Sequence, residues 1–185
     1  MDILAHMLWT NYGTKETNIA LKKKNKRTIN APWATFWGVF PDLFAFGIPI
    51  TITIITMLFS GNFSLLSLGH SLVQSSLPIN LYQYSHSLVL WAFVFGMVWI
   101  IFKRPRLELL GWLLHILIDI PSHSINFYPT PFLFPISNYH FTHGIAWSNQ
   151  WFMIINYFLL ILVYVYFYGF RKKKQKQKNF DNISS

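Results

Sequence analysis

Residues 111–123 read GWLLHILIDIPSH, and this stretch decides how the rest of the chain is interpreted. It is apolar apart from His115, Asp119, Ser122 and His123. In a helix, side chains four residues apart lie on the same face, so His115 and Asp119 share a face and His123 extends it by one turn. A histidine and a carboxylate on one face of an apolar helix are typical of half a metal site, or of an ion pair inside a membrane protein.

The helix that carries this pair is predicted to be short. Pro121 lacks a backbone donor, so we expect the helix to end or kink near Ile120. Counted from Arg106 it has about fifteen residues and a length of roughly 22 Å, which is less than the roughly 30 Å of a bilayer's hydrocarbon core. We therefore expect it to end at a polar cavity inside a helical bundle.

The composition is that of a membrane protein. Of 185 residues, 53% are hydrophobic, 19% are aromatic and only 11% are charged, whereas soluble domains have about 25% charged residues. The chain contains no cysteine, which excludes disulfides and thiolate chemistry and leaves histidine and carboxylate side chains as the metal ligands.

The apolar segments predict an all-α fold, a polytopic membrane helical bundle with about four membrane helices plus an N-terminal amphipathic helix. The predicted membrane helices are residues 33–60, 82–102, 106–120 and 148–170, and the amphipathic helix is residues 1–12. Residues 11–30 are expected to form a polar loop. We expect a single integral-membrane domain over residues 1–178, followed by a disordered polar tail at 179–185.

Basic residues are concentrated at three places along the chain. Fourteen of the fifteen Lys and Arg residues lie in Lys22–Arg27, Lys103–Arg106 and Arg171–Lys178, each at the end of an apolar segment. The positive-inside rule predicts that these clusters are cytoplasmic, which indicates a bacterial inner membrane with the basic loops and the C-terminus inside the cell. Membrane anchoring explains the net charge of +9, so membrane lipid, and not nucleic acid, is the expected partner.

Two further polar residues are predicted to lie within the apolar segments. Asp42 follows Pro41 about 13 Å into the first membrane helix, where a carboxylate costs about 2.5 to 3.5 kcal/mol and needs a partner. Alternatively, Pro41 breaks the helix and leaves Asp42 solvated near the membrane surface. His86 lies near the outer end of the second membrane helix.

Other histidines depend on how the remaining segments pack. His6 lies on the N-terminal helix, and it becomes a ligand only if that helix inserts into the bundle; otherwise it is an interfacial histidine. Residues 121–147 are rich in proline and aromatic residues and are expected to form an ordered loop or short helices over the site. His140 and His143, within that segment, are candidate extra ligands.

The candidate metal ligands form a mixed imidazole and carboxylate set. They are His6, Asp42, His86, His115, Asp119 and His123. Such a set suits a divalent metal, with zinc favoured and manganese or iron as alternatives. A divalent ion would offset the cost of burying two aspartates, and with an open coordination position it would activate a water for hydrolysis.

Four short motifs carry a resemblance to a known family. They are Ala5-His6, the FPD of Phe40–Asp42, His86-Ser87 and the GWLLHILID of Gly111–Asp119. With these motifs the sequence resembles the YdjM-like family of inner-membrane, metal-dependent hydrolases of LexA-binding type, which is distantly related to zinc-dependent phospholipase C. The resemblance implies that His6, Asp42, His86, His115 and Asp119 bind the metal. The chain departs from the family pattern at two positions, where Phe44 and Leu81 replace an aspartate and a histidine.

These observations predict a membrane-bound metal-dependent hydrolase, a phosphoesterase that acts on a membrane-associated substrate such as a lipid through a metal-activated water. They assign no general base, because Glu108 lies about 10 Å below His115 along the same helix. Two alternatives stay open. One is a proton or metal-ion transporter that uses the intramembrane His/Asp cluster, and the other is a non-catalytic membrane adaptor in which the cluster only joins helices.

Overall fold

The computed structural model describes residues 1–61, 64 and 75–171. Within these residues the regular elements are all helical and no strand is formed, which confirms the predicted all-α fold. The predicted polar tail at 179–185 lies outside the described residues.

Two helical segments are long and apolar enough to cross a membrane, and a bent pair can supply a third. The first segment comprises α2 (Ala31–Asp42), a π-helical turn (Leu43–Gly47) and α3 (Ile48–Ser60). The second comprises α8 (Gln150–Val165) and a further π-helical turn (Tyr166–Arg171). The bent pair is α5 (Leu77–Ser85) and α6 (Leu88–Phe102), which meet at an angle of 60°.

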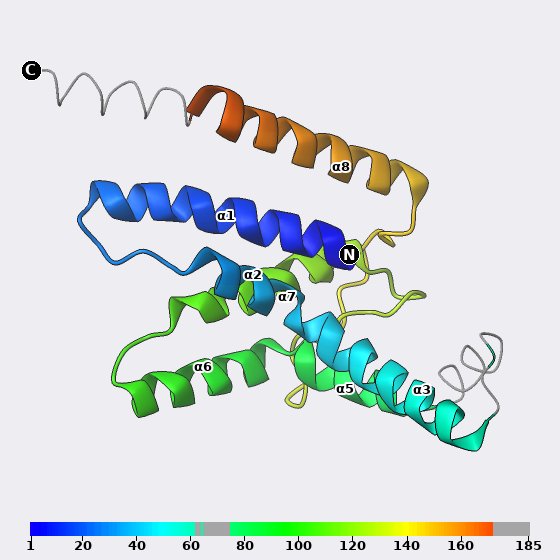
Figure 1. Cartoon of the computed structure of the whole chain (residues 1–185). Helices are drawn as coiled ribbons and strands as arrows, with labels where there is room; N and C mark the ends of the chain where they lie inside the picture. The colour runs from blue at the N-terminus through cyan, green and yellow to red at the C-terminus, as the bar shows by residue number, and fades with distance from the viewer. Residues whose placement is uncertain (62–63, 65–74, 172–185) are drawn as a thin grey trace, which may run out of the picture.

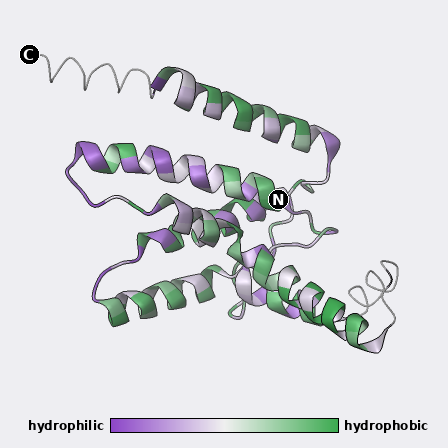
Figure 2. Ribbon diagram, in the orientation of Figure 1, coloured by the Kyte–Doolittle hydropathy of each residue, from purple (hydrophilic) through white to green (hydrophobic). Residues whose placement is uncertain are grey.

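Helix α7 (Leu110–Ser122), preceded by a 3₁₀ turn at Leu107–Leu109, is too short to span, as its sequence predicts. Pro121 is its penultimate residue, so the helix ends only slightly beyond the predicted position. Figure 2 shows the difference in character between the helices: hydrophobic residues dominate α3, α6 and α8, while α1 has a larger hydrophilic share.

Helix α1 extends from Ile3 to Lys23, so the expected polar loop at residues 11–30 is wrong for residues 11–23. The polar residues of this stretch remain helical because the bundle supplies partners for them. Glu16 forms an ion pair with Arg171 after α8, and Asn11 donates to the Thr35 hydroxyl of α2 at 3.3 Å. These contacts bind α1 along its length to the apolar helices.

Small residues allow α1, α2 and α7 to pack with their backbones close together. A Cβ atom on Gly111 of α7 would lie 2.0 Å from the carbonyl oxygen of Ala34 in α2. A Cβ atom on Gly38 of α2 would lie 2.2 Å from the Oγ1 atom of Thr10 in α1. Neither position can accept a larger side chain without movement, and this close packing brings polar residues of the three helices together.

The helices are arranged so that the C-terminal ends of α1, α6 and α8 lie at the same side of the bundle, the left side in Figure 1. Each of the three basic clusters begins at the C-terminal end of one of these helical segments or directly after it. The N-terminus of α1 and the segment between α7 and α8 lie toward the opposite side. The bundle therefore has one basic end, and the long connection between α7 and α8 lies away from that end.

Residues 123–149, which join α7 to α8, contain no long helix but are held in place by the break between α5 and α6. The backbone N–H of Leu88 donates to the carbonyl of Phe132 at 2.9 Å, and the Ser87 hydroxyl donates to the carbonyl of Phe134. This agrees with the expected ordered loop over the polar site.

Candidate metal centre

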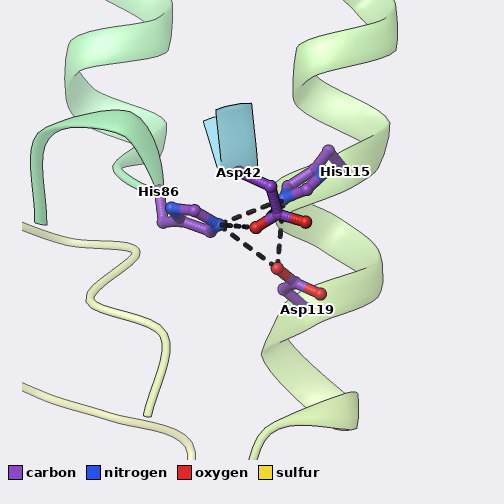
Figure 3. A group of neighbouring side chains, drawn as sticks. All are labelled: Asp42, His86, His115 and Asp119. Carbon is purple, nitrogen blue, oxygen red and sulfur yellow. Dashed lines mark hydrogen bonds and ion pairs between the residues drawn. The ribbon is translucent and has the colours of Figure 1, made fainter. Parts of the chain in front are cut away.

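Four side chains from three parts of the chain converge inside the bundle. Asp42 comes from the end of α2, His86 from the break between α5 and α6, and His115 and Asp119 from α7, as Figure 3 shows. Each offers one ligand atom, and these four atoms lie within 4.8 Å of one another. All four residues are buried.

Asp42 is placed in this group because the helix does not break at Pro41. Pro41 lies inside α2, and the helical path continues through the π-helical turn of residues 43–47 into α3. Such turns occur frequently at functional sites. The residue is 7% exposed, so the alternative of a solvated Asp42 at the membrane surface is wrong.

His86 lies at the break itself. It follows the last residue of α5, and the Ser87 side chain caps α6 by accepting the backbone N–H of Leu90 at 3.1 Å. The 60° bend turns His86 toward α7. A serine N-cap explains why a new helix begins at this point without a proline or glycine.

Backbone carbonyls favour one protonation pattern for the two histidines of the cluster. The Nδ1 atom of His115 lies 2.8 Å from the carbonyl oxygen of Gly38, and the Nδ1 atom of His86 lies 3.2 Å from that of Tyr82. Since a carbonyl can only accept, we assign the proton of each neutral ring to Nδ1. The Ser85 hydroxyl oxygen lies 2.9 Å from Nδ1 of His86, and it can accept that proton while its own proton is donated to the Tyr82 carbonyl, 3.4 Å away. Each Nε2 atom then has a free lone pair, and the two Nε2 atoms lie 3.0 Å apart.

The two carboxylates face the same point. The Oδ1 atom of Asp42 lies 3.5 Å from Nε2 of His86 and 3.7 Å from Nε2 of His115. The Oδ2 atom of Asp119 lies 3.3 and 3.2 Å from the same two nitrogens, and it is buried without a hydrogen-bond donor. Four electron-pair donors thus face one another with no proton between them, an arrangement that a cation stabilises.

The spacing of these atoms fits a small divalent ion. Bonds of about 2.0 to 2.1 Å to a tetrahedral zinc ion place its ligand atoms about 3.3 to 3.4 Å from one another. The five distances between ligand atoms given above range from 3.0 to 3.7 Å. The sixth distance, between the two carboxylate oxygens, is bounded by the 4.8 Å that encloses the whole set. The residues therefore suit a divalent metal in ligand type and in these five distances, and the same ligand types also suit manganese or iron.

His6 enters the bundle and contacts this group from α1. Its Nε2 atom lies 2.9 Å from Oδ1 of Asp119, and its ring stacks on that of His115 at 3.7 Å between centroids. Burial and the neighbouring His115 lower the pKa of His6 to about 4, so the ring is neutral at physiological pH and donates to the carboxylate. His6 thus contacts Oδ1 of Asp119, the oxygen that is not part of the four-atom group. The Nδ1 atom of His6 is buried without a hydrogen-bond partner.

His123 lies beside the group, just beyond the end of α7. Its Nε2 atom is 3.6 Å from Oδ1 of Asp119, and its Nδ1 atom is 2.6 Å from the carbonyl oxygen of Tyr128. Burial lowers the pKa of His123. His140 and His143, the candidate extra ligands, are not brought to the cluster: His140 lines a neighbouring cavity, and His143 is exposed beside the Thr142 hydroxyl.

Tyr82 is a site residue that the sequence reasoning missed. Its ring stacks on that of His86 at 3.8 Å between centroids, and its hydroxyl lies 3.0 Å from Nδ1 of His123. The sequence contains a signal for this contact, because Tyr82 precedes His86 by four residues and residues at this spacing share a helix face. The amino group of Met1 is a second unforeseen neighbour, which contacts Asp119 and lies 3.1 Å from Nε2 of His123.

A cavity of about 490 Å³ reaches the group from one side. Asp2, Asp42 and His123 contribute polar groups to its wall, and aromatic side chains such as Phe46, Phe127 and Trp147 contribute much of the rest. Of the four clustered residues only Asp42 lines this cavity. A molecule in it therefore approaches the cluster on the Asp42 side.

Comparison of the chain with protein-family models, with curated proteins and with solved structures finds no match in any of the three. The function must therefore be inferred from the residues of the site.

Proposed function

We propose that this protein is a membrane-bound, metal-dependent hydrolase that cleaves a phosphoester in a membrane-associated substrate. The observation that carries the proposal is the convergence of two imidazole nitrogens and two carboxylate oxygens next to an apolar cavity. A bound divalent ion supplies Lewis acidity and an activated water in such a setting. Hydrolysis transfers the water oxygen to phosphorus, and the leaving alcohol departs with a proton.

The chain's own residues have separate roles in this proposal. His86, His115 and Asp119 are fully buried and hold the ion, and His6 fixes the orientation of Asp119. Asp42 completes the set and faces the substrate cavity. The distances from Asp42 to the two nitrogens are the longest of the set, which favours this side for the open coordination position that catalysis requires.

The motif resemblance supports membership of the YdjM-like family of metal-dependent hydrolases, and we propose that membership as well. Four of the five residues that the resemblance implies as ligands lie in the four-atom group, and the fifth, His6, contacts Asp119. Phe44, which replaces a family aspartate, packs against Phe40 with its ring centroid 5.6 Å away.

We also propose that the basic end of the bundle is cytoplasmic and that the membrane is a bacterial inner membrane. The C-terminal ends of α1, α6 and α8 lie on the same side of the bundle in Figure 1. The positive-inside rule favours the cytoplasm for an end that carries basic clusters. The N-terminus of α1 and residues 123–149, which line the cavity, then face the outer leaflet.

The first test is the metal content of the full-length protein purified in detergent. We expect about one or more equivalents of zinc, manganese or iron in the wild type, a loss of metal in a His115→Ala, Asp119→Ala double variant, and unchanged content in His143→Ala. The metal-loaded protein is then tested for hydrolysis of soluble and lipid phosphodiesters. Metal-free preparations, even after incubation with each ion, would exclude the hydrolase.

The same preparations separate the non-enzymatic alternatives. Four protein ligands around zinc can also form a closed structural site, which is the observation that favours an adaptor. Such a protein would retain metal and hydrolyse nothing. A transporter would release its ion, and movement of zinc into vesicles that contain the protein would identify it.

A further inference from the structure

A second cavity, of about 360 Å³, adjoins the first and shares Phe127 and Tyr128 with it. None of the four residues of the candidate metal centre lines this second cavity. Its wall includes three polar side chains, from Gln83, Asn126 and His140. Gln83 comes from α5, and the other two come from the loop between α7 and α8.

These three polar side chains have no hydrogen-bond or ion-pair partner within residues 1–61, 64 and 75–171. The cavity that they line has no lysine, arginine, aspartate or glutamate in its wall. A ligand with an ammonium group would find no carboxylate there, and an anionic ligand would find no lysine or arginine. Neutral groups that both donate and accept hydrogen bonds match the two amides and the imidazole.

The remaining wall is largely aromatic, with Tyr82, Phe127 and Tyr128 among its residues. Flat apolar rings combined with a few planar polar side chains suit a polyol or sugar, because its carbon skeleton packs on the rings while its hydroxyls pair with the amides. The chemistry of the wall therefore favours a neutral, hydroxyl-rich ligand.

Tyr82 connects this second cavity with the candidate metal centre. Tyr82 lines the cavity and stacks on His86 at 3.8 Å between ring centroids. Its hydroxyl lies 3.0 Å from Nδ1 of His123, which lines the first cavity. A ligand that spans the two cavities would pass beside Asp42 and His123.

The first cavity suits the other part of an amphiphile. Ile3 and Leu4 line it and are about half exposed at the bundle surface, where a hydrocarbon chain can enter. We propose that the second cavity binds the neutral, hydroxyl-rich head group of the substrate, while the first cavity binds its hydrocarbon chain. This inference rests on the proposed function, because it places the phosphoester between the two cavities.

The test is head-group binding by metal-free, full-length protein in detergent. The probes are dihexanoyl phosphatidylglycerol and phosphatidylinositol, compared with dihexanoyl phosphatidylmethanol, which has the same chains and the same single negative charge but no free hydroxyl. Binding is followed by tryptophan fluorescence, since Trp147 lines the first cavity. Two or more hydrogen bonds predict that the polyol lipids bind about tenfold more tightly.

Variants link the preference to the second cavity. In Gln83→Leu, Asn126→Leu protein the preference should fall close to unity, whereas Asn138→Leu, an exposed asparagine outside the cavity wall, should retain it. The metal content of each single variant after reloading shows whether a loss of the head-group preference reflects misfolding. Equal binding of phosphatidylglycerol and phosphatidylmethanol would overturn the proposal, as would a preference that survives the double variant.

Hydrolysis is measured separately, so that the two proposals can fail independently. Head-group preference in metal-free protein, with no hydrolysis by the metal-loaded protein, would support the second cavity and contradict the phosphoesterase. Hydrolysis of every probe at the same kcat/KM, without any binding preference, would support the phosphoesterase and overturn the head-group assignment.

Discussion

The Nε2 atoms of His86 and His115 lie 3.0 Å apart, although the Nδ1 atom of each ring is next to a backbone carbonyl. With their protons on Nδ1, the two neutral rings direct lone pairs at each other and at the oxygens of Asp42 and Asp119. Unless a metal ion or an added proton lies between these atoms, the arrangement is repulsive, because like partial charges meet in a buried setting. A metal at this point should therefore contribute to the stability of the fold as well as to chemistry.

Removal of the metal is the first prediction. A ligand at about a thousand times its dissociation constant stabilises the state that binds it by about 4 kcal/mol, so chelation should lower the thermal unfolding midpoint of the detergent-purified protein by several degrees. The His115→Ala, Asp119→Ala double variant should show no such response. An unchanged wild-type midpoint after confirmed metal removal would contradict this prediction.

A second prediction concerns pH and His6. Its pKa of about 4 in the folded protein lies below the ordinary value of 6.5, so the unfolded chain takes up a proton before the folded chain does. The free energy of unfolding is then fully retained above pH 6.5 and decreases as the pH falls toward 4. The total loss is about 3 kcal/mol once His6 is protonated in both the folded and the unfolded chain.

The pH prediction is measured as the unfolding midpoint between pH 7 and 4, with chelator present throughout so that metal release does not contribute. In His6→Gln the amide can still donate to Asp119, but it does not titrate, and the dependence on pH should be weaker. Parallel curves for the two proteins would show that His6 does not control acid stability.

The sequence predicted the fold class and most of the chemistry of this site. The four-residue spacing of His115 and Asp119, and the cost of burying Asp42, identified side chains that do meet in the bundle. Spacing on one helix is a local property, which the sequence shows directly. The insertion of His6 was left open, because it depends on how closely α1 can approach α2 and α7, a property of the packed bundle.

Other features were not predictable for similar reasons. The break that orients His86 contains neither proline nor glycine. It depends on the Ser87 cap and on hydrogen bonds that Ser87 and Leu88 donate to carbonyls of a loop more than forty residues away. Helix α1 continues beyond residue 12 because Glu16 and Asn11 find partners on other helices. Long-range partners of this kind override local polarity, so a single sequence read locally predicts a loop.

A third prediction concerns Tyr82 as the cover of the metal centre. Its ring lies between His86 and the second cavity, so Tyr82→Ala should open a path to the ion. We expect metal transfer to a chromogenic chelator to become about tenfold faster or more, within the range that residues supporting metal ligands show. Tyr82→Phe retains the ring and should release metal at nearly the wild-type rate. Equal rates in the alanine variant and the wild type would exclude a covering role.

The close contact of α2 and α7 gives the last prediction. A methyl group added at Gly111 meets the carbonyl oxygen of Ala34 at 2.0 Å, and this is rigid backbone, so Gly111→Ala must push the helices apart. We expect a destabilisation of about 1 to 3 kcal/mol and weaker metal binding, because His115 and Asp119 move away from Asp42. Gly96→Ala in α6 is the matched control: nothing lies within 4 Å of its added Cβ, and alanine favours the helix by up to about 1 kcal/mol. Thermal unfolding and metal titration of both variants test the prediction. If Gly111→Ala matches Gly96→Ala in both measurements, the close approach of α2 and α7 does not hold the metal centre together.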